Sequence, residues 1–237
     1  LRSRRWSPCP RLRARERGPA PSTQADLWVW LRGSNAGELV NRSRGWVQLL
    51  SSSFTASRVV DGFGFNGGRG LSGYIDGTEN PVGEDARAAA VCTSSSATLA
   101  GSSFVAVQQW VHDLGHFQTF SSDERDNIFG RRISDNKEME EAPAFAHVKR
   151  TAQESFDPEA FLVRRSMPWA DAAGEGLMFV AFGHSFDAFE AQLRGMLGLD
   201  DGIVDGLFSF SRAMSGSYFW CPPVLPSGRL DLTSVAP

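Results

Sequence analysis

The chain has little cysteine and no long apolar segment, and each scarcity excludes a class of protein. Its 237 residues include three cysteines, Cys9, Cys92 and Cys221, which are too few and too scattered for a disulfide framework or a zinc ribbon. This scarcity favours a reducing compartment, and we expect a cytoplasmic protein. The longest apolar runs, such as residues 177–183, are too short to span a bilayer, so we expect no membrane partner.

Positive charge is concentrated at the N-terminus. Residues 1–23 carry seven arginines and one glutamate, a net charge of +6, so the remainder carries −9 of the total of −3. A nucleic-acid-binding arm needs a second basic element, which the acidic remainder does not supply, and we expect no nucleic-acid partner. We interpret residues 1–24 as a basic disordered leader. An organelle transit peptide is the alternative for an Arg-rich, acid-poor leader.

Hydrophobic periodicity predicts two units after this leader. In the first, residues 26–33 and 54–61 are predicted strands that flank a helix over 35–52, with Asn35 as its N-cap. The second follows the order β-α-β-β-α-β of a ferredoxin-like unit, with a long loop after its first helix. Its strands are predicted at 103–113, 161–166, 177–183 and 216–222, and its helices at 121–130 and 186–197.

These patterns predict an α+β protein of two ferredoxin-like units, the first of them incomplete. We expect the partial first unit at residues 25–85, an Ala/Ser-rich linker at 86–102, the second unit at 103–224 and a tail at 225–237. The first unit ends in a Gly-rich loop that is too long for an ordinary connection, and such loops are usually functional or disordered.

A few polar residues are candidates for chemistry. Asp76 lies between glycines in GYIDGTENP at 73–81, a pattern that taken alone predicts a turn. In the strand FLVRRS, one of Arg164 and Arg165 must face inward, where it needs a bound anion or an internal ion pair. His112 and His116 are four residues apart, as metal ligands on one helix face would be, but they also fit polar residues at a strand end.

Several motifs, in matching order over residues 26–223, together resemble the dye-decolourising peroxidases, in particular the bacterial class B. They are GYIDGTENP, SSFVAVQQWVHDL, FGRR, FAHV, VRRSMPW, LMFVAFGHS and FSFSRAMSGSYFW. The resemblance implies a fold of the dimeric α+β barrel type, with haem b in the C-terminal unit. It also implies oxidation of bulky dyes and phenols by hydrogen peroxide, assembly into a homo-oligomer, and the tail as an address for encapsulin cargo.

The same resemblance implies roles for individual residues. Asp76, in the distal-haem loop of the first unit, and Arg164 would lie over the distal face of the haem and promote heterolysis of the O–O bond. His147 would be the proximal ligand of the iron. The remaining haem contacts would be Arg131 at a propionate, Glu138 at the haem edge and Phe179 as a wall of the distal pocket.

Two positions depart from the family pattern and leave alternatives open. Ser166 stands where the family has Asn beside the distal arginine, and Ser209 stands where it has an Asp that orients the proximal histidine. The second carboxylate is absent unless Asp205 replaces it. A haem-binding or haem-handling protein with weak peroxidase turnover is therefore the alternative function. A non-haem metal site on His112 and His116 is a third.

Overall fold

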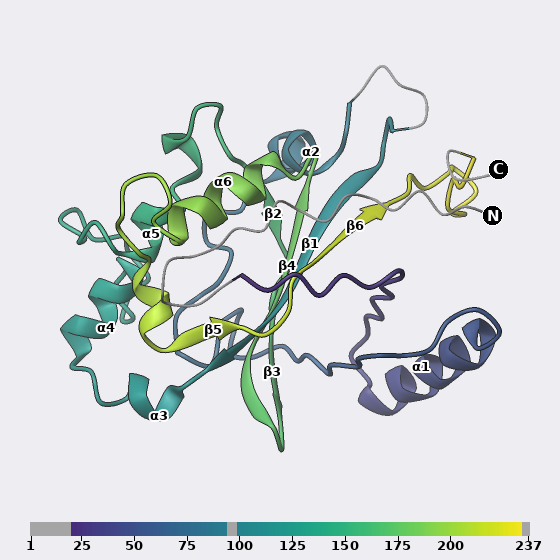
Figure 1. The fold of residues 1–237 in the computed structure, drawn as a ribbon, viewed down its shortest axis with the longest axis horizontal. Helices are drawn as coiled ribbons and strands as arrows, with labels where there is room; N and C mark the ends of the chain where they lie inside the picture. The colour runs from purple at the N-terminus through teal and green to yellow at the C-terminus, as the bar shows by residue number, and fades with distance from the viewer. Residues whose placement is uncertain (1–19, 94–98, 234–237) are drawn as a thin grey trace. The chain divides into compact units, whose positions relative to one another are not determined.

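The computed structural model describes residues 20–93 and 99–233 and has the α+β composition expected from the sequence (Figure 1). The described residues form two compact units, Ala25–Asp61 and the residues on either side of it. The helices are α1 (Ala36–Leu50), α2 (Gly83–Ala90), α3 (Leu114–Phe117), α4 (Ser122–Phe129), α5 (His147–Arg150) and α6 (Asp187–Met196), with 3-10 turns η1 (Gln153–Ser155) and η2 (Gly206–Ser209). The strands are β1 (Ser103–His112), β2 (Val163–Arg164), β3 (Met167–Asp171), β4 (Gly174–Gly183), β5 (Ser211–Ala213) and β6 (Ser217–Cys221).

The larger unit is built on an antiparallel sheet with β1 at its centre. One edge of β1 pairs with β4, and the other pairs with β6 and then with β5. β2 and β3 pair in turn with β4. In this register Ala106 lies between Ala181 and Tyr218. The order β2-β4-β1-β6 is consistent with the predicted ferredoxin-like unit.

One face of this sheet packs against α6. Along α6, Phe189 and Leu193 lie on one side of the helix because they are four residues apart. Both pack against Ala106 and Ala181 of the sheet and against Leu162, which is 2% exposed. Helices α4, α5 and α6 gather on the same side of the sheet (Figure 1). Burial of this apolar stripe fixes α6 on the sheet and leaves the loops before and after it to build a site.

Helix α4 ends where the chain must turn toward a candidate residue. It begins at a capping box between Ser121 and Glu124, as the sequence predicts. It ends at Gly130, whose φ of 77° is left-handed. A Cβ at Gly130 would lie 2.3 Å from a methyl carbon of Val148, so only glycine fits without a shift of the chain. The turn delivers Arg131 as the next residue.

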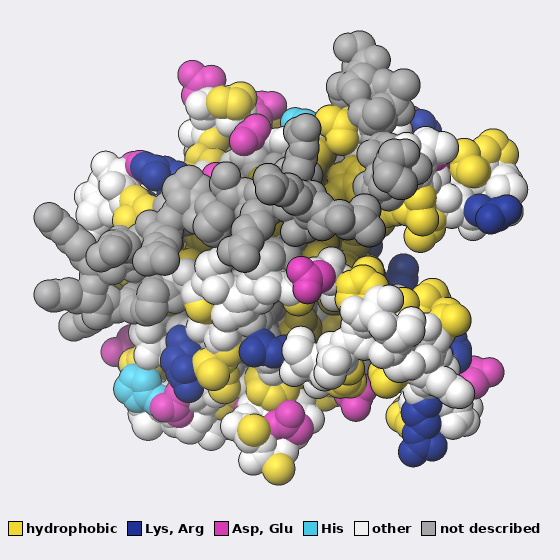
Figure 2. Space-filling model, turned by 45° about the vertical axis from the view of Figure 1, so that its right-hand side comes forward, with side chains coloured by type: hydrophobic (Ala, Val, Ile, Leu, Met, Phe, Trp, Pro, Cys, Tyr) yellow, Lys and Arg dark blue, Asp and Glu magenta, His cyan; other side chains and the backbone are white. Residues whose placement is uncertain are grey.

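The smaller unit, Ala25–Asp61, contains helix α1 and no strand. The helix and its N-cap are confirmed, because the Asn35 side chain accepts a hydrogen bond from the Glu38 N–H. The strands predicted at 26–33 and 54–61 are wrong, because neither segment forms the regular ladder of backbone hydrogen bonds that defines a strand. None of the residues of α1 is buried, and Figure 2 shows hydrophobic side chains at the molecular surface. Large exposed apolar side chains of this unit include Val40, Trp46, Val47 and Leu49.

Strand β3 and the expected linker differ from expectation. Strand β3 was not predicted; it forms a hairpin with β4, in which Met167 pairs with Met178. The segment expected as a linker begins inside helix α2. Residues 1–19 of the expected leader and 234–237 of the tail lie outside the described residues. At the leader's end the chain is ordered, since the Gln24 amide bonds both backbone groups of Tyr218 in β6.

No helix among the described residues is long and apolar enough to cross a membrane. The proposed division into a partial unit at 25–85 and a haem-binding unit at 103–224 stays a prediction.

Candidate functional site

A cavity opens in the larger unit between the Gly-rich loop, the end of α4, helix α5 and strand β2. It contains about 670 Å³ of space free of atoms, a figure that includes space open to solvent. Its lining includes residues from segments far apart in the sequence: Tyr74, Asp76, Glu79, Phe129, Arg131, Glu138, His147, Thr151, Gln153 and Arg164. The fold therefore brings together all but one of the residues singled out as haem contacts.

The loop at 73–81 is shaped by a glycine and two amide side chains. Gly77 has a left-handed φ of 75°, and a Cβ there would lie 2.7 Å from the side-chain nitrogen of Asn80. The Asn80 amide accepts a hydrogen bond from the Arg164 N–H at 2.8 Å and donates one to the Arg164 carbonyl at 2.9 Å. The Asn80 side chain thus pairs with the backbone of β2 as a neighbouring strand would.

A second side-chain amide, that of Gln153, also connects this loop to the segment that leads into β2. The Gln153 side chain donates to the Glu79 carbonyl at 2.7 Å and accepts from the Leu162 N–H at 3.1 Å. Gln153 is 4% exposed, so both bonds lie out of water. The two amides hold the loop of Asp76 against the strand of Arg164.

Replacing Asn80 with alanine is expected to lower the free energy of unfolding by about 1–3 kcal/mol, because the Arg164 N–H loses the side-chain oxygen that accepts from it and the Arg164 carbonyl keeps only its hydrogen bond from Arg165. Denaturant unfolding monitored by tryptophan fluorescence measures the change. Asn41→Ala, on the exposed surface of α1, is the control and should change stability by no more than about 0.5 kcal/mol. Equal stability of the two variants would show that the amide pairing is not formed.

Asp76 and Arg164 face each other in the cavity. The Arg164 Nε lies 3.6 Å from an Asp76 carboxylate oxygen, too far for a hydrogen bond. That Nε is buried and has no hydrogen-bond partner among the described residues. Arg165 is exposed, so one member of the arginine pair faces inward, as strand alternation predicts. A buried guanidinium nitrogen without a partner is costly, and a bound anion or polar ligand would relieve that cost.

His147 is held by a carboxylate behind it. It is the first residue of α5, and its Nδ1 lies 2.7 Å from Asp205 Oδ2, which belongs to a side chain with no exposed surface. Asp205 is itself fixed, because its other oxygen accepts from the Leu207 N–H at 2.8 Å. The carboxylate therefore takes Nδ1 and leaves Nε2 as the ring nitrogen for a ligand. Asp205 supplies the carboxylate that Ser209 cannot.

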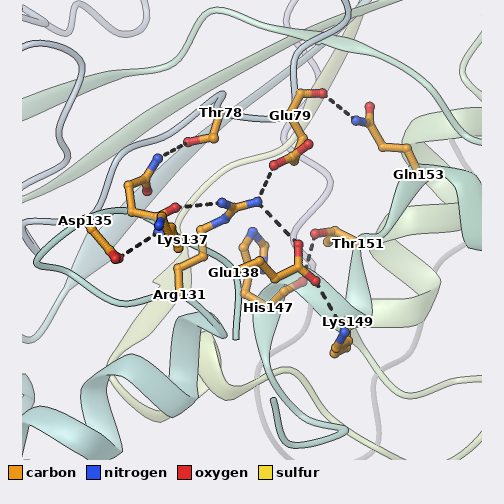
Figure 3. Close-up of polar contacts among 11 residues, drawn as sticks. Thr78, Glu79, Arg131, Asp135, Lys137, Glu138, His147, Lys149, Thr151 and Gln153 are labelled. Atoms are coloured by element: carbon orange, nitrogen blue, oxygen red, sulfur yellow. Dashed lines mark hydrogen bonds and ion pairs between the residues drawn. The ribbon is translucent and has the colours of Figure 1, made fainter. Parts of the chain in front are cut away.

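Arg131 lies at the centre of a charged network at the cavity wall (Figure 3). It is 8% exposed, and its guanidinium forms ion pairs with Glu79 and, at 3.4 Å, with Glu138. It also donates to the Asn136 carbonyl at 2.8 Å. Glu138 lies 3.3 Å from the Lys149 ammonium. A buried arginine needs either a bound anion or an internal ion pair, and Arg131 forms internal ion pairs.

Other candidates lie elsewhere. Phe179 is not among the residues that line the cavity, and its ring packs 5.9 Å from that of Phe189 under α6. The structure thus places Phe179 under α6, and its role as a wall of the distal pocket stays a prediction. His112 is half-buried and its Nδ1 lies 2.7 Å from the Ser211 hydroxyl, and desolvation lowers its pKa to about 4. His116 packs against Phe120.

The third reading, a non-haem metal site, gains no support. Across residues 20–93 and 99–233, no group of three or more His, Cys, Asp or Glu side chains is placed to hold a metal ion.

Three of the residues that shape the cavity were not found from the sequence: Glu79, Asn80 and Gln153. Asn80 and Gln153 act on backbone groups far away in the sequence, and Glu79 pairs with an arginine 52 positions on. No local spacing encodes such contacts. Only the D-G-T-E-N-P motif marked Glu79 and Asn80, as residues of a turn.

Comparison with known proteins agrees with this geometry. Residues 67–225 match the family described as Dyp-type peroxidase, C-terminal. Because this match covers more than half of the chain, the protein belongs to the Dyp-type peroxidase family.

Individual relatives are similar over most of the chain. A dye-decolorizing peroxidase of Mycobacterium tuberculosis is 31% identical over 214 residues, which cover 88% of this chain and 64% of that protein. One of Rhodococcus erythropolis is 30% identical, over 86% of this chain and 61% of that protein. The chain thus spans less than two thirds of the length of these curated relatives.

Solved structures show the same fold. A variant of DypB from Rhodococcus jostii RHA1, in complex with heme, matches with a TM-score of 0.81 and 30% identity, over 87% of this chain and 69% of that one. The encapsulated DyP-type peroxidase from Mycobacterium smegmatis matches with a TM-score of 0.80 and 26% identity, over 87% of this chain and 69% of that one.

Proposed function

We propose that this protein is a haem b peroxidase that uses hydrogen peroxide to oxidise bulky dyes and phenolic compounds. One observation carries the proposal. A single cavity is lined both by an imidazole backed by a buried carboxylate, His147 with Asp205, and by a carboxylate facing an arginine, Asp76 with Arg164. The first pair suits an iron ligand, and the second suits proton transfer and charge stabilisation.

The residues of the cavity fit a haem group. His147 would hold the iron through Nε2, since its Nδ1 is already bonded. Arg131 is a cation that can meet a propionate, in exchange for or beside Glu79. The Arg164 Nε is a buried donor without a partner among the described residues, so it has a hydrogen bond to give to a ligand. When bound, haem would supply the iron at which peroxide is reduced.

Asp205 orients and polarises the imidazole. It accepts the Nδ1–H, fixes the tautomer with Nε2 free, and makes the ring a stronger electron donor. Glu138 and Lys149 form an ion pair at the edge of the cavity beside Arg131, where they hold that guanidinium in place.

Asp76 and Arg164 act on the peroxide. The Asp76 carboxylate would accept a proton from one oxygen of the peroxide and return it to the other, which leaves as water. Arg164 would stabilise the negative charge that develops on the leaving oxygen. Their separation of 3.6 Å leaves the carboxylate without a hydrogen bond to that Nε, so it can still accept the proton.

A haem-binding protein with weak turnover is the second candidate. Ser166 favours it, because its hydroxyl is buried and has no hydrogen-bond partner among the described residues, where the resemblance expects an Asn. The encapsulated relative from Mycobacterium smegmatis supports a further proposal, that this chain is cargo of an encapsulin shell through residues 225–237. A homo-oligomer and a cytoplasmic location stay predictions.

Haem titration of the purified chain tests the proposal. We expect a Soret band that saturates at one haem per chain, followed by peroxide-dependent bleaching of an anthraquinone dye. A saturating Soret band without bleaching would favour the second candidate. Absence of a Soret band would overturn both.

Replacing Asp205 with asparagine is expected to weaken haem affinity about 10- to 100-fold and to raise the reduction potential of the iron, because the imidazole loses its anionic partner. Haem titration and spectroelectrochemistry measure the two effects. Asp201→Asn is the matched control, since that carboxylate pairs with Arg150 and not with His147. An unchanged potential in Asp205→Asn would contradict the positioning role.

A further inference from the structure

Tyr74 is a buried phenol at the wall of the cavity. Its side chain is 5% exposed, and the residue lies two positions before Asp76 in the same loop. The ring stacks on that of Phe129, with centroids 3.8 Å apart and an angle of 11° between the planes. Phe129 also lines the cavity. The neighbouring core residues Phe117, Ile128 and Phe210 keep the other sides of the ring dry.

The hydroxyl of Tyr74 has a base in direct contact. It donates a hydrogen bond to Asp126 Oδ1, from α4. The same oxygen accepts the Ile133 N–H at 3.1 Å, so the carboxylate is held in place. Burial and the hydrogen bond to Asp126 raise the pKa of Tyr74 well above its ordinary value. The phenol therefore keeps its proton at neutral pH.

A phenol that loses an electron becomes a strong acid at its O–H. In a buried site a positively charged phenol radical would be costly, and a base in contact removes that cost by taking the proton as the electron leaves. Asp126 meets this requirement for Tyr74. Before the step the pair carries one negative charge, and after it both members are neutral.

We propose that Tyr74 is an internal electron donor of this protein and that Asp126 is the base that takes its proton. The inference rests on the proposed function, because the oxidant is haem oxidised by peroxide. In the step Tyr74 gives one electron to that oxidant, its O–H bond breaks, and the proton passes to Asp126 Oδ1. A reductant at the surface later returns the electron, and the proton returns to the phenol oxygen.

The burial of Tyr74 explains why such a donor is useful. A bulky dye cannot touch a side chain that is 5% exposed, so an electron that passes from the dye to Tyr74 must cross protein. Tyr74 stores the oxidising equivalent as a neutral radical inside the aromatic cluster until an electron arrives.

The chain provides a matched control, because it has only two tyrosines. The hydroxyl of Tyr218 lies 3.3 Å from a carboxylate oxygen of Glu190, and its ring stacks on Phe186. Tyr218 is not among the residues that line the cavity. Tyr218 therefore has a carboxylate and an aromatic ring beside it, as Tyr74 does, but it does not lie at the cavity.

Electron paramagnetic resonance of haem-loaded protein, frozen after mixing with peroxide, tests the proposal. We expect a tyrosyl radical that narrows with ring-deuterated tyrosine, disappears in Tyr74→Phe and persists in Tyr218→Phe. Asp126→Asn should lower its yield by at least tenfold. A wild-type yield in Tyr74→Phe would overturn the inference, and so would a protein that consumes peroxide without any tyrosyl radical.

A second measurement needs no haem. In the Tyr218→Phe variant, ultraviolet absorbance follows the ionisation of Tyr74 alone. A free phenol ionises near pH 10, and we expect no ionisation of Tyr74 at that pH. Asp126→Asn in the same background should lower the pKa of Tyr74, while burial of the ring still holds that pKa above its ordinary value. Ionisation near pH 10 with Asp126 intact would overturn the pairing. A missing Soret band, by contrast, identifies failure of the proposed function itself.

Discussion

The His147→Ala variant is expected to lose the Soret band of bound haem at concentrations that saturate the parent protein. His147 is the imidazole of the cavity lining, and its Nδ1 is already bonded to Asp205. Alanine removes the axial nitrogen and leaves a buried carboxylate without its partner. Haem that still entered the cavity would be held by apolar contacts and Arg131 alone. Absorption spectra during haem titration provide the measurement.

Two comparisons make this result specific. His116→Ala is the matched control, because His116, in α3, packs against Phe120 and is not part of the cavity lining. The Soret band of this variant should equal that of the parent protein. In His147→Gly, added imidazole should restore the band, which separates ligand loss from misfolding. An unchanged Soret band in His147→Ala would mean that the iron ligand is another residue.

The Arg164→Leu variant is expected to react with peroxide about 100- to 1,000-fold more slowly, the usual effect of removing one donor that stabilises charge in a transition state. The reason lies in its position, facing Asp76 at 3.6 Å with a buried Nε that has a hydrogen bond to give. Haem affinity should change far less, because His147 and Arg131 remain. Rapid mixing of the haem-loaded protein with peroxide measures the rate.

The neighbouring arginine is the control for this experiment. Arg165 follows Arg164 directly but is exposed, since adjacent residues of a strand point to opposite faces. Arg165→Leu should react with peroxide at nearly the parent rate. If Arg164→Leu reacted as fast as Arg165→Leu, the charge-stabilising role would be wrong.

The larger unit was predictable from its sequence because its signals are local. The capping box at Ser121 fixed the start of α4, and the stripe of Phe189 and Leu193 fixed α6. The strands of the smaller unit were not predictable, because the β-forming residues at 26–33 and the alternation at 54–61 indicate a strand only where the tertiary context supports one. Strand β3 was missed for a related reason: its pairing with β4 depends on a turn that a run containing Pro168 does not suggest.

The sequence predicted which residues form the site but not the contacts that hold those residues in place. Motifs marked Asp76, His147 and Arg164, and the fold brings them to one cavity. The contacts that hold them come from residues with no signature, such as Gln153, or from one of several candidate acids, such as Asp205. Long-range pairing of a single amide or carboxylate carries no periodicity, so only the folded chain reveals it.

The pairing of Asn80 with the strand of Arg164 also bears on how the protein ages. Asparagines lose their amide mostly through a cyclic imide, formed when the next residue's backbone nitrogen attacks the side chain. Here the next residue is Pro81, whose nitrogen carries no hydrogen and cannot close that ring. The amide that bonds both backbone groups of Arg164 is thereby protected from the commonest spontaneous damage to asparagine.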